Sequence, residues 1–181
     1  MKYFYLISQR VFLSVLLFIF PQKAFPSGIE IVDQGVSVFM YHRFNESKFP
    51  STNVSEEQFF SHIKYIQEND FDILDIDQVI KSIDEGKVFS KKSVALTVDD
   101  AYESFYSVAW PYLKENNIPV TLFVSTESVD QNPGGYMSWD QIRSFVSEGG
   151  IVGQHTASHL HMPMHDTVSY THLTLPTKVT V

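Results

Sequence analysis

The sequence predicts an α/β protein in which helices cover a mainly parallel sheet, and two observations support this prediction. Five short apolar runs, each typical of a buried strand, alternate along the chain with four helix-forming segments. Parallel strands need a crossover between them, which a helix commonly supplies. Of the 181 residues, 44% are hydrophobic and 19% are charged, which is the balance of a globular domain and not of a disordered chain.

The first predicted strand and the first predicted helix are separated by a polar loop. Residues 36–40 form a short apolar run. Residues 55–58 have the S-x-x-Q form of a capping box, so we expect a helix to begin at Ser55. Apolar residues follow at helical spacing and are expected to face the core: Phe59, Ile63 and Ile66.

The next elements are predicted as a strand, a short helix and a third strand. Residues 71–76 are the strand, and residues 77–85 are the helix, which is expected to stop at Gly86 because glycine suits a left-handed C-cap. Residues 93–98 are apolar and partly β-branched, which favours a buried strand.

Residues 103–117 are predicted to be helical, with one interruption. Their apolar residues are expected to face inward: Phe105, Ala109, Tyr112 and Leu113. Pro111 lies inside this segment, where a proline removes a backbone hydrogen bond. We therefore expect the helix to be kinked or divided there.

The last predicted elements are a strand, a loop, a helix and a fifth strand. Residues 120–125 form the strand, and a second capping box at residues 138–141 opens a helix that ends at Gly149 and Gly150. Residues 151–154 are the fifth strand. A closed (β/α)₈ barrel takes about 250 residues, so five strands fit either a small open sheet or the front part of a barrel.

The N-terminal residues 1–28 have the three-part layout of a secretory signal. Lys2 and Arg10 precede the apolar run 11–20, and a segment with two prolines follows. A run of ten residues is too short for a hydrocarbon core that needs about 20 helical residues. We expect export to the periplasm, the cell envelope or the extracellular space, with an uncleaved membrane anchor as the alternative.

The C-terminal residues 168–181 are interpreted as a non-native tail. The run resembles the in-frame translation of a transposase-type sequencing adapter, so His172 is not counted as a ligand. Residues 168–177 also alternate like a strand, and a genuine edge strand is the alternative. Residues 29–167 remain as the interpretable domain.

Charge and cysteine content exclude several classes of function. The 13 basic and 21 acidic residues give a net charge of −8, and all the acidic residues lie in the middle of the chain. This distribution argues against nucleic acid as a partner. Because the chain has no cysteine, any metal must be bound by His, Asp or Glu.

Polar side chains follow three of the predicted strands, at the edge where parallel β/α proteins gather functional groups. His42 and Arg43 follow the first strand. Asp99 and Asp100 follow the third, and His155 and His159 follow the fifth. Two imidazoles and a carboxylate can bind one divalent cation and leave positions open. In isolation, His residues four apart often arise by chance, and adjacent carboxylates often mark a turn.

Two motifs resemble those of one family. Residues 97–100 (Thr-Val-Asp-Asp) resemble the T-F-D-D motif, and residues 155–159 resemble the H-[ST]-x-x-H motif, of polysaccharide deacetylases, the NodB-homology family of carbohydrate esterases. The resemblance covers residues 36–161. Residues 40–43 and 136–140 are similar to the branch that acts on poly-β-1,6-N-acetylglucosamine.

The resemblance implies a deformed (β/α) barrel and a polysaccharide N-deacetylase, a hydrolase of carbon–nitrogen bonds other than peptide bonds. Asp99 matches the family's catalytic base. Asp100, His155 and His159 match the ligands of a divalent metal ion, Zn²⁺ foremost. The implied partner is a polysaccharide that contains N-acetylglucosamine. A catalytically inactive glycan-binding remnant and a metal-dependent amidase acting on a non-carbohydrate amide are the alternatives.

The sequence departs from the family's pattern in several places. Val98 stands where the family has Phe, and Ala101 stands where it has Gly, which matters if that position requires a positive φ. An Arg that orients the base and a downstream His that acts as general acid have no counterpart before Thr167. We therefore expect an incomplete barrel of about five strands, a truncated domain and impaired activity.

Overall fold

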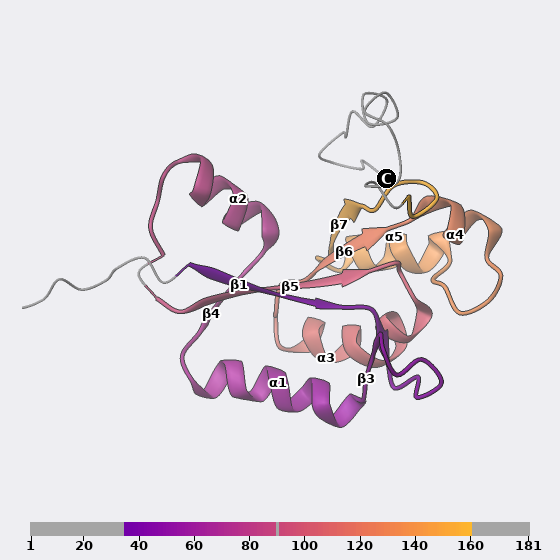
Figure 1. Cartoon of the computed structure of the whole chain (residues 1–181), viewed down its shortest axis with the longest axis horizontal. Helices are drawn as coiled ribbons and strands as arrows, with labels where there is room; N and C mark the ends of the chain where they lie inside the picture. The colour runs from indigo at the N-terminus through magenta and orange to yellow at the C-terminus, as the bar shows by residue number, and fades with distance from the viewer. Residues whose placement is uncertain (1–34, 90, 161–181) are drawn as a thin grey trace, which may run out of the picture. The chain divides into compact units, whose positions relative to one another are not determined.

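The computed structural model describes residues 35–89 and 91–160, and five parallel strands form the centre of this part of the chain (Figure 1). They are β1 (Val36–Tyr41), β4 (Asp72–Leu74), β5 (Ser93–Asp99), β6 (Thr121–Val124) and β7 (Ile151–Gln154). The sheet order is β1-β5-β6-β7, and β4 also pairs with β5. All five predicted strands are therefore present, and each pairs in parallel as expected.

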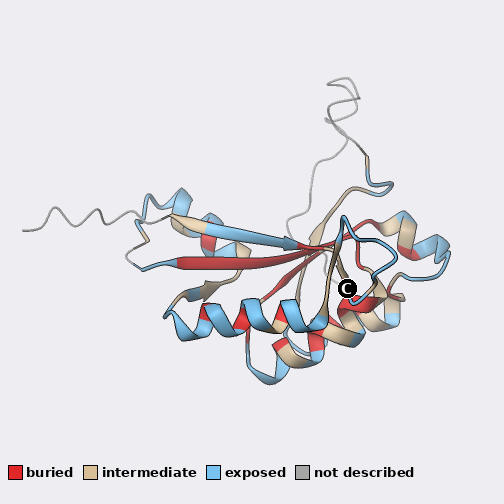
Figure 2. Cartoon of the chain, turned by 60° about the horizontal axis from the view of Figure 1, so that its bottom comes forward, coloured by how far each residue is buried: buried red, intermediate tan, exposed pale blue. Residues whose placement is uncertain are grey.

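Strand β5 is the hub of the sheet and is buried along its whole length (Figure 2). One of its edges pairs with β1 from Ser93 to Val98. The other edge is shared, because β4 pairs with residues 93–95 and β6 pairs with residues 97–99. The carboxyl end of β5, which carries Asp99, therefore lies beside β6.

Within the described residues, three helices begin with a capping box. In each, the N-cap side chain accepts a hydrogen bond from the backbone N–H of a glutamine three residues later, and the side chain of that glutamine accepts one from the backbone N–H of the N-cap residue. The boxes predicted at Ser55 and Ser138 are present, at the start of α1 (Glu56–Glu68) and of α5 (Trp139–Ser147). A third box, formed by Asp75 and Gln78, opens α2 (Ile76–Asp84). Helix α1 buries the predicted apolar residues: Phe59, Ile63 and Ile66.

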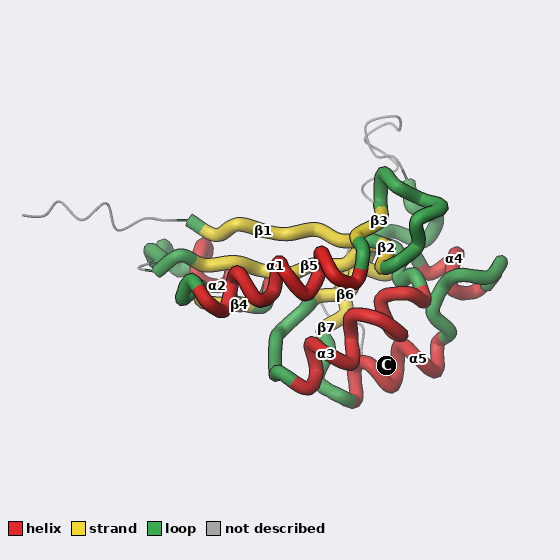
Figure 3. Tube along the Cα trace, turned by 90° about the horizontal axis from the view of Figure 1, so that it is seen from below, coloured by secondary structure: helices red, strands yellow, loops and turns green. Residues whose placement is uncertain are grey.

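The predicted division of the helix at Pro111 is confirmed. Residues Phe105–Ala109 form a π-helical turn, η1, and α3 (Trp110–Glu115) begins directly after it. Pro111 thus lies in the first turn of α3, where the missing N–H costs little. Both α1 and α3 lie along the same face of the sheet (Figure 3), and the rings of Phe60 and Tyr112 meet there at 4.7 Å.

Two features of the fold were not predicted. A short helix, α4 (Thr126–Gln131), begins directly after β6, in a segment expected to be a loop. The polar loop after β1 contains two paired strands of two residues each, β2 (Arg43–Phe44) and β3 (Asn53–Val54). Both are shorter than the pattern lengths from which helices and strands are recognised.

The expectations for the two ends of the chain fall outside the described residues. These are the signal or anchor at residues 1–28, the tail at residues 168–181, and His172. Within residues 35–89 and 91–160, every helix is too short or too polar to cross a lipid bilayer.

A carboxylate at the end of α5 ties this helix to α3. Glu148 Oε2 accepts hydrogen bonds from the indole N–H of Trp110 at 2.8 Å and from the ammonium group of Lys114 at 2.9 Å. Its other oxygen lies 3.1 Å from the hydroxyl of Ser144. The hydrogen bond from Lys114, followed by that from Trp110, lowers the pKa of Glu148.

We expect Glu148→Gln to lower the melting temperature near neutral pH. Because the pKa of Glu148 is lower in the folded state, its carboxylate stabilises the fold above the unfolded-state pKa, and this contribution disappears as the pH falls through the folded-state value. The difference between wild type and variant should therefore shrink below about pH 4. Thermal melts across this range test it, with Glu115→Gln, an exposed carboxylate of α3, as the control. An equal loss at every pH would contradict the assignment.

Candidate metal centre

The four predicted site residues come from the ends of two strands that flank β6. Asp99 is the last residue of β5 and Asp100 follows it, whereas His155 comes directly after β7. The backbone N–H of His155 donates to the carbonyl of Val124 at 3.0 Å, so the start of the histidine loop continues the pairing of β6 with β7. Because these strands are parallel, both sets of side chains reach the same edge of the sheet.

The structure brings the four side chains together. Asp100 Oδ1 lies 3.5 Å from His155 Nε2 and 3.3 Å from His159 Nε2. Asp99 Oδ2 lies 3.9 Å from His155 Nε2. The two imidazole rings meet edge to face, with centroids 4.7 Å apart.

Asp100, His155 and His159 fit a divalent cation. Each offers one ligand atom, and all three atoms lie within 4.8 Å of one another. Tetrahedral zinc has ligands at about 2.0–2.2 Å, which places neighbouring ligand atoms about 3.4 Å apart. The two distances from Asp100 to the imidazoles are close to this spacing, so these residues fit a small divalent cation.

The surroundings of Asp99 raise the pKa of its carboxyl group. Asp99 is buried, with 8% of its surface exposed, as is Asp100. Burial is the largest cause of the raised pKa of Asp99, and the charges of His155 and then His42 act in the opposite direction. His42 lies at the same edge of the sheet, because it follows β1, whose last residue, Tyr41, pairs with Val98 of β5.

Backbone strain is concentrated at this site. Asp100 and Ala101 have φ angles of 73° and 59°, and Thr156 and His159 have angles of 61° and 52°. A left-handed conformation costs a residue with a Cβ about 1–2 kcal/mol. The position of Ala101 therefore does adopt the positive φ for which a glycine would be suited.

The loop that carries the two histidines is attached to the start of α4. The hydroxyl of Ser125 donates to the carbonyl of His155 at 3.1 Å, and the backbone N–H of Glu127 donates to that of Ala157 at 2.8 Å. Ser125 is buried and stands at the N-cap of α4, yet its side chain makes no capping hydrogen bond. Its hydroxyl is used to hold the histidine loop instead.

Sequence reasoning did not identify Ser125. The sequence gives little indication of its contact with the histidine loop, because a serine after a strand is a common start of a helix. Its partner lies 30 residues further along the chain, so only the pairing of β6 with β7 brings the two together. Ser125 directly follows β6, which lies between the strands that carry the aspartates and the histidines, and its hydroxyl can therefore contact the carbonyl of His155.

Residues of the two other segments singled out in the sequence, 40–43 and 136–140, have partners within the fold. Arg43 pairs with Glu46, and Trp139 donates its indole N–H to Asp130 at 2.8 Å. Tyr136 stacks on Tyr102, with ring centroids 4.9 Å apart. Arg43 and Trp139 are therefore engaged by other side chains of the fold.

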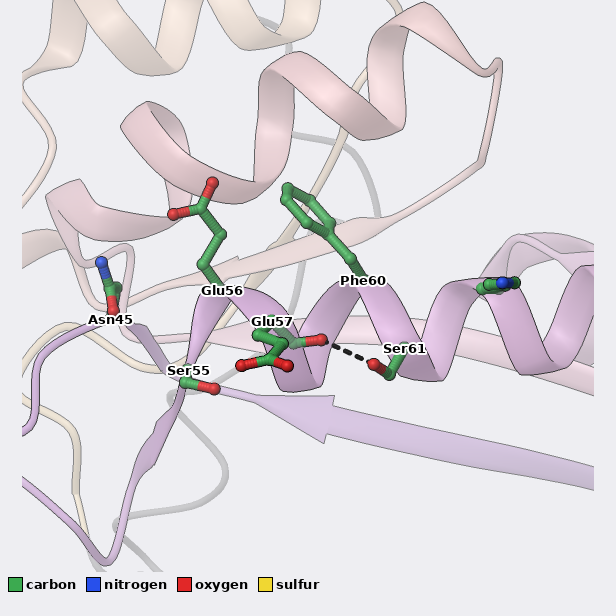
Figure 4. Close-up of a pocket in the computed structure, with 7 residues that line it drawn as sticks. Asn45, Ser55, Glu56, Glu57, Phe60 and Ser61 are labelled. Atoms are coloured by element: carbon green, nitrogen blue, oxygen red, sulfur yellow. Dashed lines mark hydrogen bonds between the residues drawn. The ribbon is translucent and has the colours of Figure 1, made fainter.

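A broad hollow lies at the start of α1, away from these four residues (Figure 4). It has a volume of about 610 Å³, and its lining includes Glu56, Glu57 and Phe60. Figure 4 shows the hydroxyl of Ser61 directed at the backbone of Glu57, to whose carbonyl it donates at 2.8 Å. None of the four site residues lines this hollow, so it is separate from the candidate metal centre.

A smaller pocket lies at the carboxyl end of β1. Its volume is about 240 Å³, and it is lined by residues 40–43 and 51–54. His42 belongs to this lining and also acts on Asp99 through its charge. Because Tyr41 pairs with Val98 of β5, this pocket lies at the same edge of the sheet as the candidate metal centre.

Comparison with known proteins identifies relatives of this chain. The family model described as polysaccharide deacetylase matches residues 86–177, just over half of the sequence. A protein of Staphylococcus aureus (strain N315), named poly-beta-1,6-N-acetyl-D-glucosamine N-deacetylase, is 33% identical over 93 residues, which are 51% of this chain and 32% of that protein.

Solved structures share the fold. The Streptococcus pyogenes deacetylase PplD in complex with acetate has a TM-score of 0.65 at 21% identity, and covers 75% of this chain and 62% of its own. IcaB from Ammonifex degensii has a TM-score of 0.62 at 28% identity, and the match covers 68% of this chain and 53% of IcaB. They confirm the predicted fold class, an incomplete (β/α) barrel of this type. The chain spans 32–43% of the length of the curated relatives it matches.

We expect Ser125→Ala to weaken the binding of Co²⁺ by about tenfold, the lower end of the effect of losing a residue that orients metal ligands. The variant leaves the carbonyl of His155 without its buried donor, which also costs about 1 kcal/mol of stability. Titration with Co²⁺, followed by its visible absorption, measures the affinity.

The matched control is Ser55→Ala, which removes the N-cap serine of α1. Its loss costs a similar amount of stability, about 1 kcal/mol, but it should leave Co²⁺ affinity unchanged. If both variants bind Co²⁺ as the wild type does, Ser125 has no part in holding the histidines.

Proposed function

The chain belongs to the polysaccharide deacetylase family, and we propose that it is a metal-dependent hydrolase that removes N-acetyl groups from a polysaccharide containing N-acetylglucosamine. The observation that carries this proposal is the approach of one buried carboxylate, Asp100, to two imidazoles at 3.5 and 3.3 Å, beside a second buried carboxylate. The name of the Staphylococcus relative supports the class of substrate.

We assign Asp100, His155 and His159 as the metal ligands and Zn²⁺ as the ion, because two imidazoles and a carboxylate suit zinc and leave a coordination position open. A divalent cation bound there would supply polarisation of the acetamide carbonyl and would make water a stronger acid. The side chains of this chain then have to position the substrate and move one proton.

Asp99 is the proposed general base. It is not part of the ligand set, and its carboxylate lies 3.9 Å from His155. As water attacks the acetamide carbon, Asp99 accepts the proton that the water loses. A carbon–oxygen bond forms, the carbon–nitrogen bond breaks, and the proton held on Asp99 passes to the nitrogen. The products are acetate and a free amine on the sugar.

We propose that turnover by this chain is slow. In the part of the chain that the structure describes, the imidazoles whose charges act on Asp99 are His42 and the two proposed ligands. In the proposed reaction Asp99 serves first as base and later as acid, without a separate general acid. A separate, positioned acid commonly contributes about 10²–10⁴-fold to such a reaction.

We also propose that the protein acts outside the cytoplasm. The support is the order of Lys2, Arg10 and the apolar run 11–20, which precede the catalytic domain. This placement agrees with a polysaccharide substrate at the cell surface, and contact with a membrane would be made only by that segment if it is not cleaved.

We expect Asp99→Asn to reduce acetate release from an N-acetylglucosamine oligomer by about 10²–10⁴-fold, since the amide cannot accept the proton. The assay uses the full chain with added Zn²⁺ or Co²⁺ and measures acetate. Asp84→Asn, on the exposed side of α2, is the control and should retain full activity. Equal rates for wild type and Asp99→Asn would refute the proposed reaction.

Two outcomes would favour the alternatives. If the wild type releases no acetate but binds the oligomer as tightly as Asp99→Asn does, the chain is a glycan-binding protein. If acetylated sugars are inert and a peptide amide is cleaved, it is an amidase.

Removal of the metal should abolish the activity. We expect dialysis against a chelator to eliminate acetate release and to lower the melting temperature, because a ligand that binds only the folded state stabilises it. Addition of Zn²⁺ should restore both properties in the wild type but not in His155→Ala. Activity that persists in the chelated protein would contradict a metal-dependent mechanism.

A further inference from the structure

The segment that carries Asp100 is strained and needs support from outside itself. Asp100 and Ala101 both have positive φ angles, which non-glycine residues hold only where the surroundings determine the backbone. Two backbone hydrogen bonds provide part of this support, from Met137 N–H to the carbonyl of Ala101 at 2.8 Å and from Glu103 N–H to that of Gly135 at 2.9 Å. These bonds hold one side of the segment.

Arg43 holds the other side by stacking. Its guanidinium carbon lies 3.4 Å from the centroid of the Tyr102 ring and 3.9 Å from that of Phe49, so the group is placed between two aromatic faces. Tyr102 is the second residue after Asp100. A planar guanidinium can stack on rings with both faces while it donates hydrogen bonds at its rim, and an ammonium group cannot.

Glu46 connects the same arginine to the strained segment a second time. Its Oε2 accepts from Arg43 Nη1 at 2.8 Å, and its Oε1 accepts from the hydroxyl of Ser104 at 2.5 Å. Ser104 Oγ in turn accepts from the backbone N–H of Phe44 at 3.2 Å. The pair therefore contacts positions two and four residues beyond Asp100.

The loop that carries Arg43 and Glu46 is itself closed. Asn45 N–H donates to the carbonyl of Val54 at 2.8 Å, and Glu46 N–H donates to Asn53 Oδ1 at 2.6 Å. The side chain of Arg43 is only 13% exposed. It is thus committed to Glu46 and the two rings, and the ion pair gains strength from its partial burial.

We propose that Arg43 and Glu46 form a clamp that positions Asp100 for metal binding. This Arg43–Glu46 clamp acts through Tyr102 and Ser104 and keeps the backbone at Asp100 and Ala101 left-handed, which directs the Asp100 carboxylate toward His155 and His159. Arg43 is a positioning residue that touches neither metal nor substrate. The inference rests on the proposed function, because it requires Asp100 to be a ligand.

The test is a Co²⁺ titration of the full chain carrying Arg43→Lys. The substitution keeps the charge and loses the stacking, and we expect Co²⁺ affinity to fall by about tenfold or more, as for other residues that orient metal ligands. Glu46→Gln is the second variant. It removes the ionic contact but keeps a side chain of the same shape, and it should give a smaller loss in the same direction.

Arg143→Lys is the matched control. Arg143 also pairs with a carboxylate three residues away, Asp140, but this pair is exposed on α5. The control should bind Co²⁺ as the wild type does. It separates the role of the clamp from the general effect of replacing a paired arginine.

A rescue experiment distinguishes positioning from a merely structural role. Glycine adopts a positive φ without the penalty of a Cβ, so Ala101→Gly should restore part of the affinity lost in Arg43→Lys, while it changes the affinity of the wild type little. A clamp that only stabilises the fold would lower the melting temperature equally with and without Co²⁺, and Ala101→Gly would not restore binding.

The outcomes for the two proposals are separable. If the wild type binds Co²⁺ and Arg43→Lys binds it equally well, the clamp is overturned and the metal site stands. If the wild type does not bind Co²⁺, both the metal site and the clamp are wrong.

Discussion

The candidate site depends on one contact, the approach of the Asp100 carboxylate to two imidazoles that come from the far side of β6. Because β5, β6 and β7 are parallel neighbours, Asp100 and His155 emerge at the same edge with one strand between them. The end of that middle strand carries Ser125, whose hydroxyl holds the carbonyl of His155. The sheet order therefore determines which residues meet and which residue supports them.

This contact is made at a cost in backbone conformation. Residues on both sides of it, Asp100 and Ala101 in one loop and Thr156 and His159 in the other, have left-handed φ angles. Neighbouring segments offset that cost, since the loop after β1 holds Tyr102 and Ser104, and the start of α4 holds Ala157. The loop after β1 and the start of α4 thus hold the two segments that carry the proposed ligands, as supporting segments commonly do around a functional site.

Much of this arrangement could be predicted from the sequence, and the reasons for the exceptions are physical. The five strands and the division at Pro111 follow from local patterns of apolar residues and from proline geometry. The convergence of Asp100 with the two histidines follows from the placement of each at the carboxyl end of a parallel strand. The contacts of Ser125 and Arg43 could not be predicted, because their partners are distant in sequence and common residue types. Helix α4 and the β2–β3 pair are too short to produce a periodic signal.

The two tryptophans of the chain, which serve as fluorescent probes, lie in neighbouring helices, α3 and α5. Trp110 packs edge to face on Phe145 of α5 and donates to Glu148, whereas Trp139 begins α5 and donates to Asp130. Trp110 therefore reports on the contact between α3 and α5, and Trp139 on the contact between α5 and α4. Tryptophan emission during denaturation will therefore record the detachment of α5, whereas β1 and α2 carry no tryptophan to report their loosening.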